Sequence, residues 1–397
     1  MMRILLVSDE TGSPENTGFR LRLANTARGL ASIATLDWLI LPRDASTTPL
    51  APADVTCVVH TSPLFLRSRV RTIGRYATCS DPGRIARIDA ASTVAHLDLP
   101  AGRYDAIWFA HLDLFHALGL VLRSRADVVV LDFDNLESMR MEHERVLATT
   151  VAHLPRAARL RLDGRRWRRA EERGADTADL AYVCSEIDRV RIGRGVRVFP
   201  NGANRPDASY HPRPDPGPIL LFVGSLSYEP NADAVEHFAD HVLPRIRARV
   251  PDATFRVVGR NAPERVRRLA TRPGIELIGE VASISPQFAE AALSVVPIRF
   301  GGGTRIKILD SFAHSVPVVT TAVGCEGIEA APGEHLLVAD TPEQFADACT
   351  ALLTDAARRA LLAQNGRSLF ERAYGWTRIR EGVASEVLSA VAATRGE

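Results

Sequence analysis

The chain has 397 residues, of which 46% are hydrophobic and 24% are charged, a composition typical of a globular protein and not of disordered or fibrous classes. A formal net charge of +2 gives no general attraction to nucleic acid, and no apolar run approaches the ~20 residues of a membrane-spanning helix. The segment from Met1 to Asp9 reaches its first acid too early for a signal peptide, so we expect a cytoplasmic protein.

Short apolar runs alternate with amphipathic stretches along the first half of the chain. This alternation predicts a doubly wound α/β domain, in which a parallel sheet carries helices on both faces. The expected strands are Arg3–Ser8, Thr35–Leu41, Val55–His60, Ala106–Ala110, Val128–Phe133, Leu180–Cys184 and Val196–Phe199. The expected helices lie near Arg20–Ser32, Leu114–Arg123, Glu137–Ala148 and Arg156–Arg173.

Gly18 opens the first expected helix, shortly after the first strand. The segment from Ser8 to Phe19 contains no G-x-G-x-x-G, which argues against a nicotinamide or flavin oxidoreductase. His111 stands just past a later strand, where a doubly wound fold places its functional loops. His116 is five residues further on, a poor spacing for a shared metal, so His111 is either a polar contact to a substrate or a structural histidine.

Two carboxylates in the pattern D-x-D, Asp132 and Asp134, end another expected strand. A D-x-D can hold a divalent metal on a diphosphate, but an incidental strand end is the favoured interpretation, and no metal is expected. The helix near Arg156–Arg173 is rich in arginine. It could contact an anionic membrane or an acidic acceptor. Its acids favour a solvated helix face.

Five prolines between positions 206 and 218 predict a linker over residues 204–217. We therefore expect a first domain over residues 1–203, a second over 218–375, and a closing helix over 376–397 that crosses back to the first domain. The second domain has its own strand series, at Ile219–Gly224, Thr254–Val258, Ile275–Ile278, Leu293–Val296 and Val316–Thr320. Two Rossmann-like domains of this kind are expected to face a central cleft that is lined by the carboxyl ends of their strands.

A glycine-initiated loop follows the first strand of the second domain. Gly224 could present its N–H to a phosphate, and Ser227 or Asn231 could cap the following helix. A plain strand-to-helix turn is an equal alternative, because such turns occur in most doubly wound domains.

The most informative segment runs from Gly301 to Lys307. Thr304 is a candidate helix N-cap that places Arg305 and Lys307 at the start of a helix, where cations oppose the helix dipole unless an anion binds there. Of the 49 basic residues in the chain, all but Lys307 are arginine, which suggests that a lysine is specifically required there. Glycines, free N–H groups and two cations together predict a phosphate site; the alternative is a flexible turn with a surface ion pair between Lys307 and Asp310.

Several motifs, through their order and spacing along the chain, resemble those of glycosyltransferase family 4, in the subgroup with a glycine-rich GGGTRxK loop. They are Pro297–Ala313, Pro317–Val319, Gly324–Gly327, Phe222–Leu226 with Tyr228–Asn231, Pro200–Gly202 and Val183–Glu186. The resemblance covers essentially the whole second domain and, more loosely, the first. It implies a GT-B fold and a metal-independent hexosyl transfer that retains anomeric configuration. Separately, the use of arginine in place of lysine fits GC-rich coding, so we expect a bacterial protein.

The resemblance also implies roles for single residues. Gly18 and Gly224 would donate N–H groups to a diphosphate, Arg305 and Lys307 would neutralise it as it leaves, and the backbone of Gly303 and Thr304 would lie beside it. In the same way, Asp310 would accept the ribose hydroxyls, Glu280 and Val281 would border the base, and His111 would contact the donor sugar.

This sequence departs from the family pattern at three positions. Two family glutamates that have seven residues between them stand here as Gly302 and Asp310, and Phe19 replaces a common second glycine. The glycine-rich subgroup shares the first of these changes.

The expected reaction moves a sugar from a nucleotide-diphosphate donor to an acceptor hydroxyl of a surface glycan or natural product. No cofactor is expected beyond the donor, with a UDP-sugar favoured over a GDP- or dTDP-sugar. The alternatives are a nucleotide-sugar epimerase or phosphorylase of the same fold, and a non-catalytic subunit that binds nucleotide sugars. Loops around Asp9–Thr17, Thr61–Pro82 and Asn135–Glu144 would shape the acceptor site. The helix near Arg156–Arg173 leaves open a peripheral contact with the inner face of the membrane.

Overall fold

The computed structural model describes residues 2–15, 17–43, 50–67, 81–147, 154–193, 195–213, 216–301 and 303–396. The chain divides into two compact units: Met1–Asn201 with Thr377–Glu397, and Gly202–Trp376. The last helix is therefore part of the first unit.

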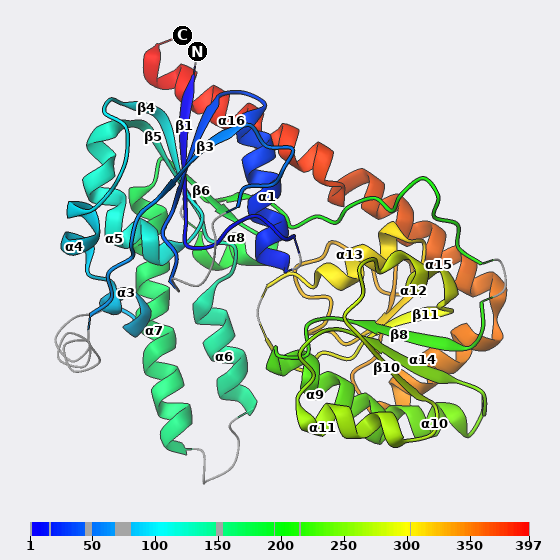
Figure 1. Ribbon diagram of the computed structural model, residues 1–397. Helices are drawn as coiled ribbons and strands as arrows, with labels where there is room; N and C mark the ends of the chain where they lie inside the picture. Colours follow the sequence, from blue (N-terminus) through cyan, green and yellow to red (C-terminus); the bar gives the residue numbers. More distant parts are fainter. Residues whose placement is uncertain are drawn as a thin grey trace. The chain divides into compact units, whose positions relative to one another are not determined.

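The first unit is built on a sheet of seven parallel strands in the order β3-β2-β1-β4-β5-β6-β7 (Figure 1). Their bounds are β1 Arg3–Ser8, β2 Thr35–Ile40, β3 Cys57–Thr61, β4 Tyr104–Phe109, β5 Ala126–Asp132, β6 Leu180–Val183 and β7 Arg197–Val198. The central strands are buried on both faces, as continuous apolar runs predict for a parallel sheet between helices.

Helices cover this sheet and contribute to its apolar core, which includes Leu5, Ile107 and Trp167. Their bounds are α1 Gly18–Ala31, α3 Gly83–Arg87, α4 Ala90–Ala95, α5 Leu112–Leu122, α6 Glu137–Leu147, α7 Leu154–Thr177, α8 Glu186–Ile192 and α16 Trp376–Arg395. The helix α16 is tied to the sheet by Glu386, which accepts a hydrogen bond from the Tyr182 hydroxyl at 2.8 Å.

The second unit repeats this plan with six parallel strands in the order β10-β9-β8-β11-β12-β13. The strands are β8 Ile219–Val223, β9 Thr254–Val258, β10 Ile275–Gly279, β11 Leu293–Val296, β12 Val318–Thr320 and β13 Leu337–Val338. The helices are α9 Glu229–His237, α10 Leu243–Arg247, α11 Glu264–Arg267, α12 Ser285–Glu290, α13 Ile306–Ala313, α14 Pro342–Thr354 and α15 Ala356–Leu369. The predicted fold class of two doubly wound α/β units is confirmed.

Two features of the second unit differ from the expectations. The stretch 204–217 was expected as a linker, but described residues in it contact this unit: the Tyr210 hydroxyl donates to the His314 carbonyl at 2.7 Å, and Arg213 pairs with Glu290 at 3.2 Å. Prolines prevented a helix or strand there but did not prevent packing. The two-residue strand β13 was not among the predicted strands.

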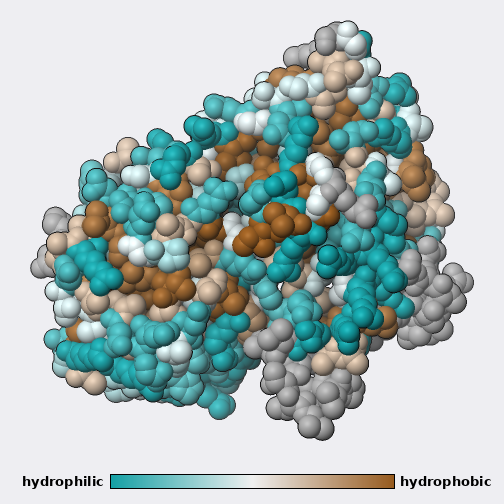
Figure 2. Space-filling model, turned by 180° about the vertical axis from the view of Figure 1, so that it is seen from behind, coloured by the Kyte–Doolittle hydropathy of each residue, from teal (hydrophilic) through white to brown (hydrophobic). Residues whose placement is uncertain are grey.

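None of the helices in the described part of the chain is long and apolar enough to cross a membrane. On the face drawn in Figure 2, hydrophilic residues cover most of the surface, and hydrophobic residues appear between them. Among the residues that the structure describes, the most exposed large apolar side chain is that of Leu120 on α5.

Candidate functional site

The strand order of the second unit reverses direction between β8 and β11, which lie next to each other in the sheet. At such a point the loops that follow the two strands diverge and leave a crevice at the carboxyl edge of the sheet, where open α/β sheets bind ligands. The loop after β8 begins at Gly224, and the loop after β11 carries the glycine-rich segment. The topology therefore brings together the two loops that the sequence analysis singled out separately.

Left-handed backbone shapes the glycine-rich loop around Arg305. Gly301 and Gly303 have φ values of 119° and 78°, which residues with a side chain rarely adopt. The Arg305 guanidinium lies beneath the loop, where it donates to the carbonyl of Gly301 at 2.9 Å and also to that of Gly303. Arg305 is only 7% exposed, and this burial lowers its pKa. Gly302, where the family pattern has a glutamate, lies outside the described residues.

The start of α13 differs from the expectation by one residue. Arg305, not Thr304, occupies the N-cap position, and no side chain caps the helix. The Thr304 hydroxyl oxygen is buried and has no hydrogen-bond partner within the described part of the chain. Lys307 still falls in the first turn of α13, next to N–H groups that have no partner within the helix.

Lys307 is partly buried and contacts neutral groups. Its Nζ donates a hydrogen bond to Oδ1 of Asn231 at 2.6 Å and lies 4.1 Å from the centre of the Phe222 ring. Burial, reinforced by the positive charge of Arg305, lowers the pKa of Lys307 to about 7. Lys307 forms no ion pair with any carboxylate of the described residues. The alternative of a surface ion pair between Lys307 and Asp310 is therefore contradicted.

Gly224 provides space at this site rather than a hydrogen-bond donor. Its N–H donates to the Val258 carbonyl at 2.9 Å, so the predicted N–H contact to a phosphate is wrong for the structure as it stands. A Cβ at Gly224 would lie 2.9 Å from both Lys307 Nζ and Asn231 Nδ2. The missing side chain is what allows these two groups to sit beside the strand end.

The sequence analysis did not predict the roles that two residues have here. Asn231 was considered as a helix cap, but it lies inside α9, accepts from Lys307 and donates to the Ser225 carbonyl at 2.8 Å. Gly259 allows close backbone approach, since a Cβ there would lie 1.9 Å from the Gly224 carbonyl oxygen. The contact between Asn231 and Lys307 joins residues far apart in sequence, and no local pattern indicates it.

Asp310 is one turn further along α13. Burial raises its pKa to about 7, and the nearby charge of Lys307 opposes this shift without cancelling it. Glu280 and Val281 follow β10, directly after Gly279 with its φ of 85°. The Glu280 carboxylate is exposed and lies 3.8 Å from Arg260, whereas Val281 packs against a small apolar cluster.

The first unit has a corresponding reversal of strand order between β1 and β4. The loops after these strands place the His111 Nδ1 2.8 Å from the Asp9 carboxylate, and the His111 ring stacks on Phe19 with 4.1 Å between ring centres. Burial alone would lower the pKa of His111, but the charge and hydrogen bond of Asp9 outweigh it and raise the pKa to about 9. Arg43 bridges Asp9 and Asp113, and Gly18 opens α1 next to Phe19.

The D-x-D carboxylates have roles within the first unit. Asp132 accepts hydrogen bonds from the buried Arg22 at 2.7 and 2.8 Å, and Asp134 is buried beside it. Across the described ranges, no group of three or more His, Cys, Asp and Glu side chains is arranged to hold a metal ion. The structure thus places Arg305, Lys307, Gly224, Gly303 and Thr304 together in the second unit, and Gly18 and His111 in the first.

Comparisons with known proteins agree with these observations. Residues 217–355 match the family model of glycosyl transferases group 1. A relative, an uncharacterized 44.6 kDa protein in the cps region of Klebsiella pneumoniae, is 25% identical over 135 residues, which are 32% of this chain and 35% of that protein. The chain therefore aligns with about a third of the length of this relative.

Solved structures resemble the whole chain. Sucrose-phosphate synthase from Thermosynechococcus elongatus superposes with a TM-score of 0.72 at 17% identity, covering 99% of this chain and 100% of that one. HepE from Anabaena, in complex with UDP and glucose, gives a TM-score of 0.62 at 14% identity and covers 98% and 100%. The chain has the GT-B fold. The family-model match lies within the second unit, whereas the shared fold extends over both units.

Proposed function

We propose that this chain is a retaining, metal-independent glycosyltransferase that transfers a hexose from a nucleotide-diphosphate donor to an acceptor hydroxyl. The observation that carries the proposal is Lys307, a cation held at the carboxyl edge of a parallel sheet by neutral partners, an amide oxygen and an aromatic ring. Its lowered pKa indicates that the nearby charge of Asp310 only partly compensates its burial. A bound diphosphate would compensate it.

The surroundings of Lys307 favour an anion that gains charge during reaction. When a nucleotide-sugar bond breaks, negative charge develops on the departing diphosphate, and fixed positive groups stabilise it most at that moment. Lys307 and Arg305 lie at the start of α13, so their charges add to the positive end of the helix dipole. Two fixed cations and a helix N-terminus can perform this task without a metal ion.

The remaining residues receive roles by their position and by the family resemblance. Asp310 accepts the ribose hydroxyls, and the loop at Glu280 and Val281 borders the base. In the first unit, His111 contacts the transferred sugar; its pKa of about 9 keeps it protonated at neutral pH, as a donor to a sugar hydroxyl. Gly18, which opens α1, donates its N–H to the donor phosphate.

We propose a UDP-sugar as the donor and a surface glycan or a natural product as the acceptor. The donor proposal is supported by HepE, a fold relative solved with UDP and glucose. We place the enzyme in the cytoplasm, where nucleotide sugars are made.

The test is UDP release from UDP-sugars over a panel of hydroxyl acceptors, with Lys307→Ala beside the wild type. We expect Lys307→Ala to lower the rate by about 10²–10³-fold, because one fixed charge on the leaving group is lost. The matched control is Arg299→Gln, which also removes one positive charge but at an exposed ion pair with Asp233 before the loop. It should keep the wild-type rate within about twofold.

Circular dichroism and thermal unfolding should show that both variants are folded. If Lys307→Ala retains most of the wild-type rate, Lys307 does not stabilise the leaving group. If UDP-sugar is converted without any acceptor, the protein is an epimerase of the same fold.

A further inference from the structure

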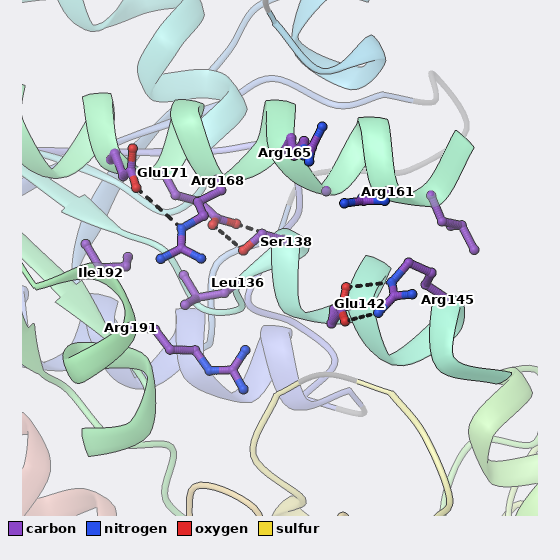
Figure 3. Close-up of a pocket in the computed structure, with 13 residues that line it drawn as sticks. Leu136, Ser138, Glu142, Arg145, Arg161, Arg165, Arg168, Glu171, Arg191 and Ile192 are labelled. Carbon is purple, nitrogen blue, oxygen red and sulfur yellow. Dashed lines mark hydrogen bonds and ion pairs between the residues drawn. The ribbon is translucent and has the colours of Figure 1, made fainter. Parts of the chain in front are cut away.

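A separate cavity of about 500 Å³ lies in the first unit between α6, α7 and α8. Five arginines line it: Arg145, Arg161, Arg165, Arg168 and Arg191. We call this cavity the arginine pocket. Figure 3 shows that its arginines come from both of the long helices, α6 and α7, and that Arg191 comes from α8. The sequence analysis favoured a solvated face for the arginines of α7; Arg161, Arg165 and Arg168 are exposed, and they also line this cavity.

The charges of the arginine pocket are only partly balanced by its own carboxylates. Arg145 pairs with Glu142 at 2.5 Å, and Arg168 pairs with Glu172 at 3.4 Å. Arg161 and Arg165, four residues apart on the same face of α7, form neither an ion pair nor a hydrogen bond with any described residue. Like charges at this spacing repel each other, so an anion between them would be attracted.

The third carboxylate of the pocket, Glu171, does not serve as a counter-ion. It is 2% exposed, and it accepts hydrogen bonds from the backbone N–H of Ser138 at 3.0 Å and from the Ser138 hydroxyl at 2.5 Å. Burial raises the pKa of Glu171 to about 7, so at neutral pH a substantial fraction is uncharged. The pocket therefore has a net positive character that its lining does not cancel.

The arginine pocket adjoins the part of the first unit to which the proposed function assigns sugar contact. Glu171 also lines a smaller cavity, of about 50 Å³, together with His111 and Asp134. The segment Asn135–Glu144, expected to shape the acceptor site, supplies Leu136, Ser138 and Glu142 to the arginine pocket. An anionic group held there would belong to a molecule within reach of His111.

We propose that the arginine pocket binds the phosphate group of a phosphorylated acceptor, with Arg161 and Arg165 as its principal ligands. Arginine suits this role because its planar guanidinium donates two parallel hydrogen bonds to phosphate oxygens. The apolar side chains of Leu136, Leu160 and Ile192 in the lining suit an acceptor that carries an apolar group beside its phosphate. The identity of the ligand as an acceptor rests on the proposed transferase function. Its binding through a phosphate group can be tested without that function.

The experiment is isothermal titration of the full chain with glycerol 1-phosphate and with inorganic phosphate, in the presence of saturating UDP so that the donor site is filled. The test variant is the double substitution Arg161→Gln with Arg165→Gln. It should weaken glycerol 1-phosphate binding by about tenfold or more, because two charge-assisted contacts are lost.

The matched control is the double substitution Arg159→Gln with Arg169→Gln. It removes the same charge from exposed positions on the same helix that do not line the pocket. It should change the affinity by less than about twofold. Equal weakening in both double variants, or the absence of saturable binding to the wild type, would overturn the proposal.

A second arm distinguishes a soluble acceptor from a lipid-linked one by sedimentation with phosphatidylcholine vesicles that contain or lack phosphatidic acid. Binding to phosphatidic acid that depends on Arg161 and Arg165 supports a lipid-borne phosphate, and glycerol 1-phosphate binding with this dependence supports a soluble one. If both double variants reduce vesicle binding equally, and glycerol 1-phosphate does not bind, the helix is attracted to anionic membranes in general. That result would refute phosphate binding in the arginine pocket. UDP titration of the wild type separates this result from the donor site: absence of UDP binding to the wild type would count against the transferase, not against the pocket.

Discussion

The two units place a basic side chain at the same topological position but surround it differently. In the first unit, the strand order reverses between β1 and β4, and His111 follows β4. It faces Asp9, which raises the pKa of His111 to about 9. In the second, Lys307 follows the corresponding strand and faces an amide and an aromatic ring, and its pKa is lowered to about 7. One positive charge is compensated within the fold, and the other is not.

This difference indicates which charge holds the fold together and which is available to a ligand. A buried cation with its own carboxylate forms part of the structure, and removing it leaves an uncompensated charge behind. A cation with neutral partners costs folding free energy, which is recovered when an anion binds. The first unit adds a stronger example of the first kind, Arg22 with Asp132, in which both side chains are almost fully buried.

The largest expected effect comes from removing a basic side chain in each unit and measuring the free energy of unfolding. Arg22→Ala should lose about 3–5 kcal/mol, because Asp132 is left buried without its partner. Lys307→Ala should change the free energy of unfolding by less than about 1 kcal/mol, since Lys307 forms no ion pair with a described carboxylate. Urea unfolding at pH 7 followed by circular dichroism measures both values.

The double variant Arg22→Met with Asp132→Leu is the control, because removing both partners should recover much of the loss. The comparison between the units fails if Lys307→Ala destabilises as much as Arg22→Ala. In that case Lys307 supports the fold and its charge is not reserved for a ligand.

Much of the architecture could be predicted from the sequence, because local patterns determine it. Apolar runs between amphipathic stretches marked every strand of the first sheet, and the boundaries of those strands moved by only a few residues. The glycine-rich loop and its unusual lysine were visible for a similar reason, since glycine and lysine have distinctive chemistry in a chain otherwise rich in arginine.

The parts that could not be predicted depend on contacts between residues far apart in the sequence. The partner of Lys307 is Asn231, on a helix that follows another strand. The Gly224 N–H donates to the Val258 carbonyl because the pairing of two strands ends at this residue. No residue pattern in the sequence shows where that pairing ends. The arginine pocket requires α6, α7 and α8 to pack around one space, whereas each helix alone shows only a charged face.

A smaller effect is expected on His111 when its carboxylate is removed. Asp9→Asn should lower the pKa of His111 from about 9 by at least about one unit, because an opposite charge within hydrogen-bonding distance is lost. Proton NMR titration of the imidazole signals measures this shift, with the His111 signal assigned from His111→Gln. Since the folded-state pKa lies above the ordinary 6.5, the interaction stabilises the fold fully below pH 6.5, and this contribution is lost as pH rises through 9.

Glu10→Gln provides the control for this titration, because it removes one negative charge from the adjacent, exposed position. It should leave the pKa of His111 nearly unchanged. An equal shift in Glu10→Gln and Asp9→Asn would mean that the general potential of the loop, and not the direct contact, holds His111 protonated.

The smallest effect, about fivefold, is expected in the pH dependence of UDP affinity. Because the pKa of Lys307 is about 7 without ligand, its protonated fraction falls from about one half at pH 7 to about one eleventh at pH 8. A diphosphate binds the protonated form, so UDP affinity should fall about fivefold over this interval, with proton uptake on binding.

Asp310 has a pKa near 7 as well, so Asp310→Asn is needed beside Lys307→Ala. Titration calorimetry in buffers of different ionisation enthalpy should show the pH dependence retained in Asp310→Asn and lost in Lys307→Ala; the opposite result would assign the titrating charge to Asp310 and leave Lys307 without its role.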